Sequence, residues 1–225
     1  MVDVSRHMNR ILEINQAERW VRVEAGVVKD QLNAALKPFG LFFAPELSTS
    51  NRATIGGMVN TDASGQGSCL YGKTRDHVLE LTTVLLDGSV LRSHALREEE
   101  LDALSDQQDR VGLIHRLVNN LQKEHRALID AKFPKLNRCL TGYDLAHIRD
   151  EKGRFNLNNI LCGSEGTLAV VLGNTLLGGV GGGALAALLL NVTPVNGLLG
   201  VASLLYFAAA SFTETVRRLG AIDGL

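Results

Sequence analysis

Residues 45–57 read Pro45-Glu46-Leu47-Ser48-Thr49-Ser50-Asn51-Arg52-Ala53-Thr54-Ile55-Gly56-Gly57, and residues 60–65 read Asn60-Thr61-Asp62-Ala63-Ser64-Gly65. We call residues 45–72, which close at Tyr71-Gly72, the first cradle. The stretch is too rich in glycine and small polar residues to be a core helix or strand. Glycine lets the main chain approach a ligand closely, and Ser, Thr and Asn place hydroxyl and amide groups beside it. The stretch therefore indicates a loop that holds a phosphorylated or heteroaromatic cofactor.

A second stretch of the same kind reads Gly163-Ser164-Glu165-Gly166-Thr167-Leu168, and we call it the second cradle. Backbone N–H groups in such loops can bind an anion without help from Lys or Arg. Within the first cradle, Ile55 to Val59 is expected to begin a short helix whose free N–H groups face the loop. Two cradles in one chain make a cofactor site the leading hypothesis.

Composition narrows the class of protein. The chain has 225 residues, and 23 basic against 24 acidic side chains give a formal net charge of -1. This balance argues against a nucleic-acid partner. Cys69, Cys139 and Cys162 lack CxxC spacing, so we expect no metal site, iron–sulfur cluster or disulfide framework. A reducing, cytoplasmic location fits best, because the N-terminus also has no apolar segment typical of a secretory signal.

Local patterns predict short strands and helices. Residues 20–24 alternate apolar and charged side chains and predict a strand, and residues 27–36 predict a helix. Val78 to Leu86 is β-branched and apolar, and Asp87-Gly88 is a strong hairpin signal before a return strand that starts at Val90.

Helical spacing of apolar residues predicts one amphipathic helix from Asp109 to Ile129, with His115 and the charged residues on its surface. Ile160-Leu161-Cys162 is interpreted as a short strand that enters the second cradle, and residues 168–171 as a strand that leaves it. The whole pattern is that of an α+β domain.

The last part of the chain has an unusual composition. Between Glu165 and Glu214 there is no Asp, Glu, Lys, Arg or His, although a soluble surface needs such side chains. We place a boundary near residue 171, which gives one domain over residues 1–171 and an apolar Gly/Ala/Leu-rich tail over residues 172–225. A packed helical pair, a membrane-associated segment and a frame-shifted sequence remain open as interpretations of this tail. The membrane interpretation would place the protein at, or anchored in, the inner membrane.

Taken together, the motifs resemble the flavin domain of the FAD-linked oxidase family, which includes D-lactate and D-2-hydroxyglutarate dehydrogenases. The similarity is greatest to large bacterial members that carry a C-terminal iron–sulfur domain. It covers roughly residues 1–170 in unbroken motif order. It rests on the two cradles, on Tyr71-Gly72-Lys73-Thr74-Arg75-Asp76-His77-Val78, on Leu86-Asp87-Gly88, on Ser5-Arg6-His7-Met8-Asn9-Arg10 and on Leu140-Thr141-Gly142-Tyr143-Asp144-Leu145.

The resemblance implies an FAD-binding PCMH-type, vanillyl-alcohol-oxidase-like fold and FAD as the cofactor. It implies hydride transfer to the flavin from a small D-2-hydroxy acid. Compared with the family pattern, we expect the first strand, helix and diphosphate loop to be missing before Val2, and the substrate-binding domain to be missing after residue 171. We therefore nominate no catalytic residue, and a non-catalytic degenerate or frame-shifted fragment remains the alternative. The resemblance assigns cofactor contacts to Pro45, Glu46, Leu47, Ser48, Thr49, Thr54, Gly56, Gly57, Asn60, Thr61, Ala63, Gly65, Tyr71, Gly72, Gly163, Glu165, Gly166, Thr167 and Val170.

Overall fold

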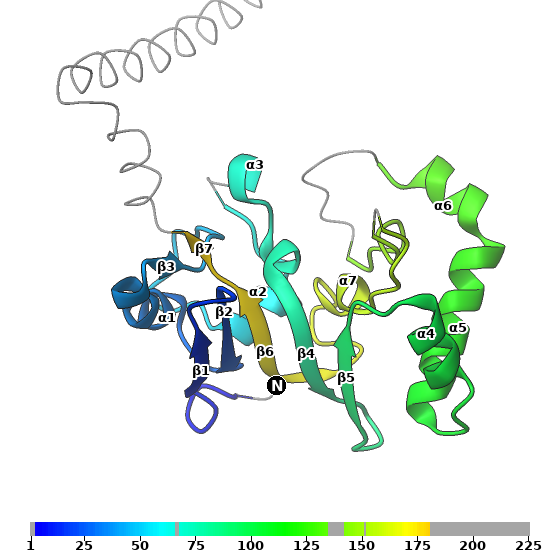
Figure 1. Cartoon of the computed structure of the whole chain (residues 1–225), viewed down its shortest axis with the longest axis horizontal. Helices are drawn as coiled ribbons and strands as arrows, with labels where there is room; N and C mark the ends of the chain where they lie inside the picture. The colour runs from blue at the N-terminus through cyan, green and yellow to red at the C-terminus, as the bar shows by residue number, and fades with distance from the viewer. Residues whose placement is uncertain (1–2, 66–67, 135–141, 151, 181–225) are drawn as a thin grey trace, which may run out of the picture. The chain divides into compact units, whose positions relative to one another are not determined.

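A computed structural model describes residues 3–65, 68–134, 142–150 and 152–180, and the chain divides into two units at Gly179 and Val180. In the first unit the described strands form an antiparallel sheet in the order β1-β2-β6-β4-β5 (Figure 1). Their bounds are β1 Ile11–Asn15, β2 Trp20–Glu24, β4 Val78–Val84, β5 Val90–His94 and β6 Val170–Leu177. A two-stranded ladder pairs β3 Leu41–Phe42 with β7 Gly179–Val180.

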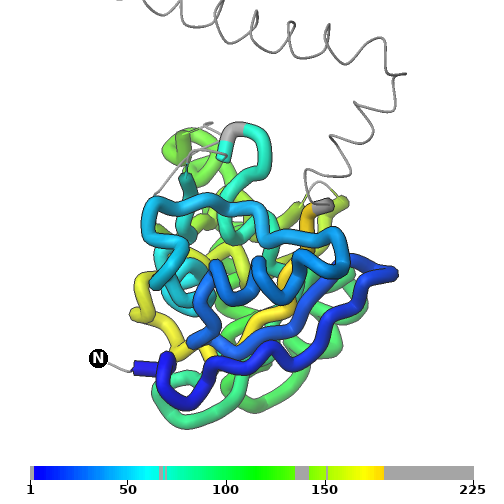
Figure 2. The backbone as a smooth tube through the Cα atoms, turned by 90° about the vertical axis from the view of Figure 1, so that its left-hand side faces the viewer, coloured from blue at the N-terminus to red at the C-terminus, as the bar shows by residue number. Residues whose placement is uncertain are grey.

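Helices lie at both edges of the sheet. Figure 1 shows α4, α5 and α6 together beyond β5, whereas α1 lies beside β1 and β2. Figure 2, turned so that the β1 side faces the viewer, shows the blue N-terminal segment with β1, β2 and α1. The helical bounds are α1 Lys29–Leu36, α2 Ile55–Asn60, α3 Ser68–Tyr71, α4 Glu98–Ser105, α5 Arg110–Glu124, α6 Arg126–Lys132 and α7 Asn158–Leu161, with 3-10 turns η1 Lys37–Phe39 and η2 Thr74–His77.

One apolar core joins the sheet to α1, α2 and α7. Val23 on β2 and Leu81 on β4 are fully buried and pair with the same central residue, Asn174 on β6. Leu32 of α1 and Ile55 of α2 are fully buried in the same cluster. β6 follows the second cradle in the sequence but lies in the sheet between β2 and β4, the strands that precede and follow the first cradle. The sheet therefore brings the second cradle close to the first.

Several sequence predictions are confirmed. The strand at residues 20–24 is β2, the predicted helix at 27–36 is α1, and the helix expected from Ile55 is α2. The hairpin is formed by β4 and β5, with Gly88 at φ 83 in its turn. A left-handed residue of this kind is the reason why Asp-Gly is such a strong turn signal.

The strand predicted at Ile160-Leu161-Cys162 is wrong, because these residues belong to α7 and the turn that ends it. The N–H of Leu161 bonds to Leu157 and that of Cys162 to Asn158. The buried Asn158 accounts for the helical turn, since its amide accepts from Ser93 Oγ at 2.6 Å and donates to the Leu79 carbonyl at 3.3 Å. Three apolar residues could not reveal these long-range bonds.

The single helix predicted at Asp109–Ile129 is also wrong in two respects. His125, at φ -106 and ψ 15, ends α5 and precedes α6. The surface position expected for His115 is wrong as well, because its ring is 1% exposed and lies 6.0 Å from the Phe155 ring. The inward side of α5 buries Asn119 and Gln122 as well as His115, while Val111, Ile114 and Val118 pack against the core. Arg149 Nη2 donates to Asn119 Oδ1 at 3.0 Å. The tertiary partners Phe155 and Arg149 therefore override the helical pattern.

The predicted strand at 168–171 begins at Val170 and continues to Leu177 as β6, across the boundary expected near residue 171. The compact unit ends at Gly179, and the assignment of residues 1–171 and 172–225 as domains stays a prediction. Residues 181–225 of the apolar tail lie outside the described residues. In the described ranges no helix is long and apolar enough to cross a membrane.

We expect His115 to make the fold sensitive to acid. Burial lowers the pKa of His115 below its usual value, so the imidazole is neutral in the folded chain. In the unfolded chain it takes up a proton below about pH 6.5, and the free energy of unfolding therefore falls as the pH drops through that range. Urea unfolding between about pH 5 and pH 8 should show this fall in the wild type and a smaller fall in His115→Gln. Equal pH dependence in the two proteins would contradict the assignment.

Candidate cofactor site

The two cradles meet at the C-terminal end of α2. The N–H of Gly163 donates to the Val59 carbonyl at 2.9 Å, and the N–H of Glu165 donates to the Asn60 carbonyl at 2.8 Å. Gly163 and Glu165 lie in the left-handed region, at φ 84 and φ 53, which turns the second cradle around the end of α2. Two segments far apart in the sequence thus form one continuous wall.

The first cradle is held closed by a close backbone approach. A Cβ at Gly65 would lie 1.4 Å from the Glu46 carbonyl oxygen, so only glycine allows the two ends of the loop to touch. The N–H of Gly65 donates to Ser68 Oγ at 2.7 Å, and the carbonyl of Leu47 accepts from Ser50 Oγ at 2.6 Å. The loop is therefore ordered by its own hydrogen bonds.

The expectation that α2 presents free N–H groups is wrong. The N–H of Ile55 donates to the Val27 carbonyl at 2.8 Å, and that of Gly56 donates to the Ala25 carbonyl at 2.7 Å. The N–H of Gly57 donates to Oγ1 of Thr54, the N-cap residue, at 3.3 Å. The start of α2 thus joins the segment after β2, and its first turn has no donor left for an anion.

The residues assigned to the cofactor differ in accessibility. Side chains and backbone are exposed at nine positions, partly buried at seven and buried at three. The exposed positions are Glu46, Ser48, Gly57, Thr61, Tyr71, Glu165, Gly166, Thr167 and Val170; the partly buried ones are Leu47, Thr49, Thr54, Asn60, Ala63, Gly65 and Gly72; the buried ones are Pro45, Gly56 and Gly163. Pro45, Gly56 and Gly163 shape the wall from behind. The exposed and partly buried positions form the surface that a ligand could contact.

The wall has unused polar groups that suit a polar cofactor. Among the described residues, the backbone N–H groups of Ser48 and Thr49 make no hydrogen bond. The amide oxygen Oδ1 of Asn60 is buried and also has no partner there. A buried polar atom without a partner is costly unless a ligand or water satisfies it. The residues present therefore fit one side of a site for a group such as FAD, which would meet backbone donors and amides.

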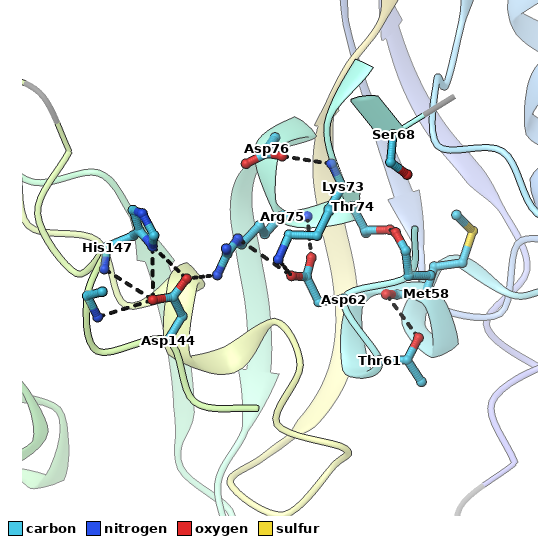
Figure 3. Close-up of polar contacts among 12 residues, drawn as sticks. Met58, Thr61, Asp62, Ser68, Lys73, Thr74, Arg75, Asp76, Asp144 and His147 are labelled. Atoms are coloured by element: carbon cyan, nitrogen blue, oxygen red, sulfur yellow. Dashed lines mark hydrogen bonds and ion pairs between the residues drawn. The ribbon is translucent and has the colours of Figure 1, made fainter. Parts of the chain in front are cut away.

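A buried ion pair lies directly behind this wall (Figure 3). Lys73 Nζ lies 2.8 Å from Asp62 Oδ2, and their side chains are 1% and 7% exposed. Asp62 Oδ1 also accepts from the N–H of Arg75 at 3.0 Å. Asp62 has φ 45, and this left-handed turn after α2 aims its carboxylate at residues 73–75.

The ion pair extends to a third segment through Arg75. Its Nε lies 3.5 Å from Asp62 Oδ2, and its Nη1 contacts Asp144 Oδ2. Asp144 also accepts from the N–H groups of Ala146 and His147 at 3.1 and 3.2 Å. Two carboxylates and two cations thus join residue 62, residues 73–75 and residues 144–147, and their formal charges cancel.

His147 lies at the outer end of this charge network. Its Nδ1 is 2.8 Å from Asp144 Oδ2. Partial burial, and after it the positive charges of Arg75 and Lys73, lower the pKa of His147. At neutral pH the neutral ring donates from Nδ1 to the carboxylate, because a carboxylate can only accept.

Sequence reasoning placed these residues inside motifs but gave them no role. Asp62, Lys73 and Arg75 belong to the first cradle and its exit, and Asp144 belongs to Thr141-Gly142-Tyr143-Asp144. The available signal was the presence of charged residues inside motifs that are rich in glycine and small polar residues. A charged residue that must pack inside a loop needs a partner, but the sequence does not tell which one.

We expect Asp62→Asn to destabilise the chain by about 3–5 kcal/mol, because Lys73 would stay buried without its carboxylate. Asparagine tolerates the left-handed backbone, so the effect isolates the charge. In the double variant Asp62→Asn/Lys73→Met, both charges are gone and most of the stability should return. Urea unfolding of the four proteins in this cycle gives the coupling energy. A single-variant cost below about 1 kcal/mol, the value of a surface pair, would contradict a buried pair.

Comparison with known proteins agrees with the cradle geometry. Residues 1–94 match the family model described as the FAD binding domain. The D-2-hydroxyglutarate dehydrogenase of Pseudomonas putida is 67% identical over 172 residues, which are 76% of this chain and 17% of that protein. The enzyme of the same name from Escherichia coli is 60% identical over the same shares.

More distant relatives match a shorter segment. A glycolate oxidase subunit of Bacillus subtilis is 37% identical over 93 residues, 41% of this chain and 20% of that protein. The chain thus spans about a sixth to a fifth of the length of these relatives. The resemblance drawn from the motifs is confirmed: residues 1–94 match an FAD binding domain, and the relatives matched over 172 residues are named D-2-hydroxyglutarate dehydrogenases.

Proposed function

We propose that the chain is the FAD-binding part of a flavin-dependent oxidoreductase that oxidises a D-2-hydroxy acid of the D-2-hydroxyglutarate class. The observation that carries the proposal is the junction of the two cradles at α2, made by the N–H groups of Gly163 and Glu165. It builds one continuous wall from the two segments that the resemblance assigns to the cofactor. The substrate class rests on the names of the relatives that are 57% to 67% identical.

When bound, FAD would supply the redox chemistry by accepting a hydride from the carbon that bears the hydroxyl group. The residues of this chain would bind and orient it. The N–H groups of Ser48 and Thr49 can donate to cofactor oxygens, and Asn60 Oδ1 can accept from an N–H or O–H group. The charge network of Asp62, Lys73, Arg75 and Asp144 fixes the wall from behind. A pre-ordered wall reduces the entropy lost when the cofactor is ordered.

Asn60 offers a specific test of cofactor binding. Asn60→Ala removes a buried oxygen that has no partner within the described chain, so the free energy of unfolding of the FAD-free protein should not fall. The dissociation constant for FAD should rise about tenfold, by the loss of one hydrogen bond. Quenching of flavin fluorescence during titration measures the affinity, and urea unfolding measures the stability.

Asn120→Ala is the matched control, because Asn120 is exposed on α5 and lies outside both cradles. We expect little change in FAD affinity for this variant. Equal effects of the two substitutions would refute the role given to Asn60. Absence of any flavin binding by the folded wild-type chain would favour the alternative of a non-catalytic fragment.

A chimera tests the proposed reaction. In the Pseudomonas putida dehydrogenase, the matched 172-residue region would be replaced by the corresponding region of this chain. We expect the chimera to bind FAD and to oxidise D-2-hydroxyglutarate with kcat/KM within about tenfold of the parent, a barrier change of about 1.4 kcal/mol. A folded chimera that binds FAD but leaves the substrate unoxidised would limit the proposal to cofactor binding.

A further inference from the structure

The outward face of α5 carries a row of exposed leucines. Leu113, Leu117 and Leu121 follow one another at four-residue steps and are 40%, 58% and 41% exposed. Leu128 on α6 is 56% exposed. Single exposed leucines are ordinary, but three at successive four-residue steps form a contiguous apolar stripe, on a helix that already packs Val111, Ile114 and Val118 against the core. Such a face indicates an interaction surface.

The leucine stripe borders an apolar hollow. A cavity of about 380 Å³ lies beside α5 and is lined by Ile114, Val118, Leu121, Leu145 and Leu161, among other residues. Leu121 belongs to both the stripe and the hollow. The apolar surface therefore extends from the helix to the loop segments beside it.

A charged residue lies at each end of the leucine stripe, at the same distance in the sequence from Leu117. Arg110 lies seven residues before Leu117, and Glu124 lies seven residues after it. Seven residues are almost two turns of a helix, so both charges lie within about 20° of the direction of Leu117. Leu113 and Leu121 lie four residues to either side, within about 40°. The stripe thus reads Arg, Leu, Leu, Leu, Glu with Leu117 at its centre.

We infer that this face pairs with a second copy of the chain, with the two α5 helices antiparallel and Leu117 on the two-fold axis. An isologous interface needs a self-complementary patch, in which residue i meets j and j meets i. Here Leu113 meets Leu121 of the second copy, and Arg110 meets Glu124 of the second copy at both ends. A parallel arrangement would instead place like charges together.

The charges at the ends of the stripe are able to make these contacts. Arg110 uses Nε for Asp87 Oδ2 at 2.9 Å, which leaves its two terminal nitrogens for a partner. The Glu124 carboxylate makes no ion pair among the described residues. Figure 1 shows α5 at the side of the first unit beyond β5, where β1, β2 and β3 do not cover it.

Charge reversal on the full 225-residue chain tests the pairing. Sedimentation equilibrium should show a dimer for the wild type. Arg110→Glu and Glu124→Arg should each raise the dimer dissociation constant by about tenfold, because each sets like charges opposite one another. The double variant Arg110→Glu/Glu124→Arg restores opposite charges and should return the constant to near the wild-type value.

Leu117→Glu should abolish the dimer, since it places two carboxylates on the two-fold axis. Leu86→Glu is the matched control, because Leu86 is 99% exposed on the β4–β5 turn and should leave the dimer intact. Circular dichroism confirms folding of each variant. A monomeric wild type, association that persists in Leu117→Glu, or a double variant that stays as weak as the single ones would overturn the inference. Capture of a different protein by a monomeric chain would assign the face to that protein instead.

Discussion

The buried pair of Asp62 and Lys73 is the constraint on which the candidate site depends. Both side chains are nearly inaccessible to water and their charged atoms are 2.8 Å apart. A buried charge is tolerated only when its partner is in place, so the left-handed turn at Asp62 and the chain at residue 73 must come together. Arg75 contacts both Asp62 and Asp144, so the segment at residue 144 must also lie close to them. Three short segments, at residue 62, residues 73–75 and residues 144–147, are thereby held in one arrangement, which explains how a glycine-rich wall can be ordered.

The network also affects the electrostatics of the wall. Lys73 and Arg75 neutralise Asp62 and Asp144, so they do not act as free cations at the surface. A diphosphate would therefore meet backbone N–H groups and amides rather than a basic side chain. Since the first turn of α2 has no free donor, those N–H groups belong to the loop at Ser48 and Thr49. We infer that the ion network mainly fixes the positions of these segments and adds little to the free energy of unfolding. A buried ion pair is often no more stabilising than apolar side chains of similar volume.

Local signals predicted the elements that local bonds determine. The Asp87-Gly88 turn, the alternation in β2 and the start of α2 at Ile55 each depend on neighbouring residues, and each was predicted from the sequence. Features fixed at long range were not predictable. Asn158 makes a helical turn because of Ser93 and Leu79, and the N–H groups of α2 are used by Val27 and Ala25. For the site, the two cradles could be named from composition, but their junction at Val59 and Asn60 could not.

The orientation of α5 shows the same rule most clearly. Val111, Ile114 and Val118 pack against the core, as helical spacing predicts, and Arg149 holds Asn119 inward beside them. Its guanidinium bonds to Glu98 Oε2 at 2.7 Å and to Asn119 Oδ1 at 3.0 Å, and it lies over the Phe155 ring. Turning the leucine stripe inward would leave this partly buried guanidinium without Asn119 and would take Val111, Ile114 and Val118 out of the core. The core residues of α5 and the Arg149 contact together determine which face of the helix is exposed, and an apolar stripe held outward in this way is best explained by a partner.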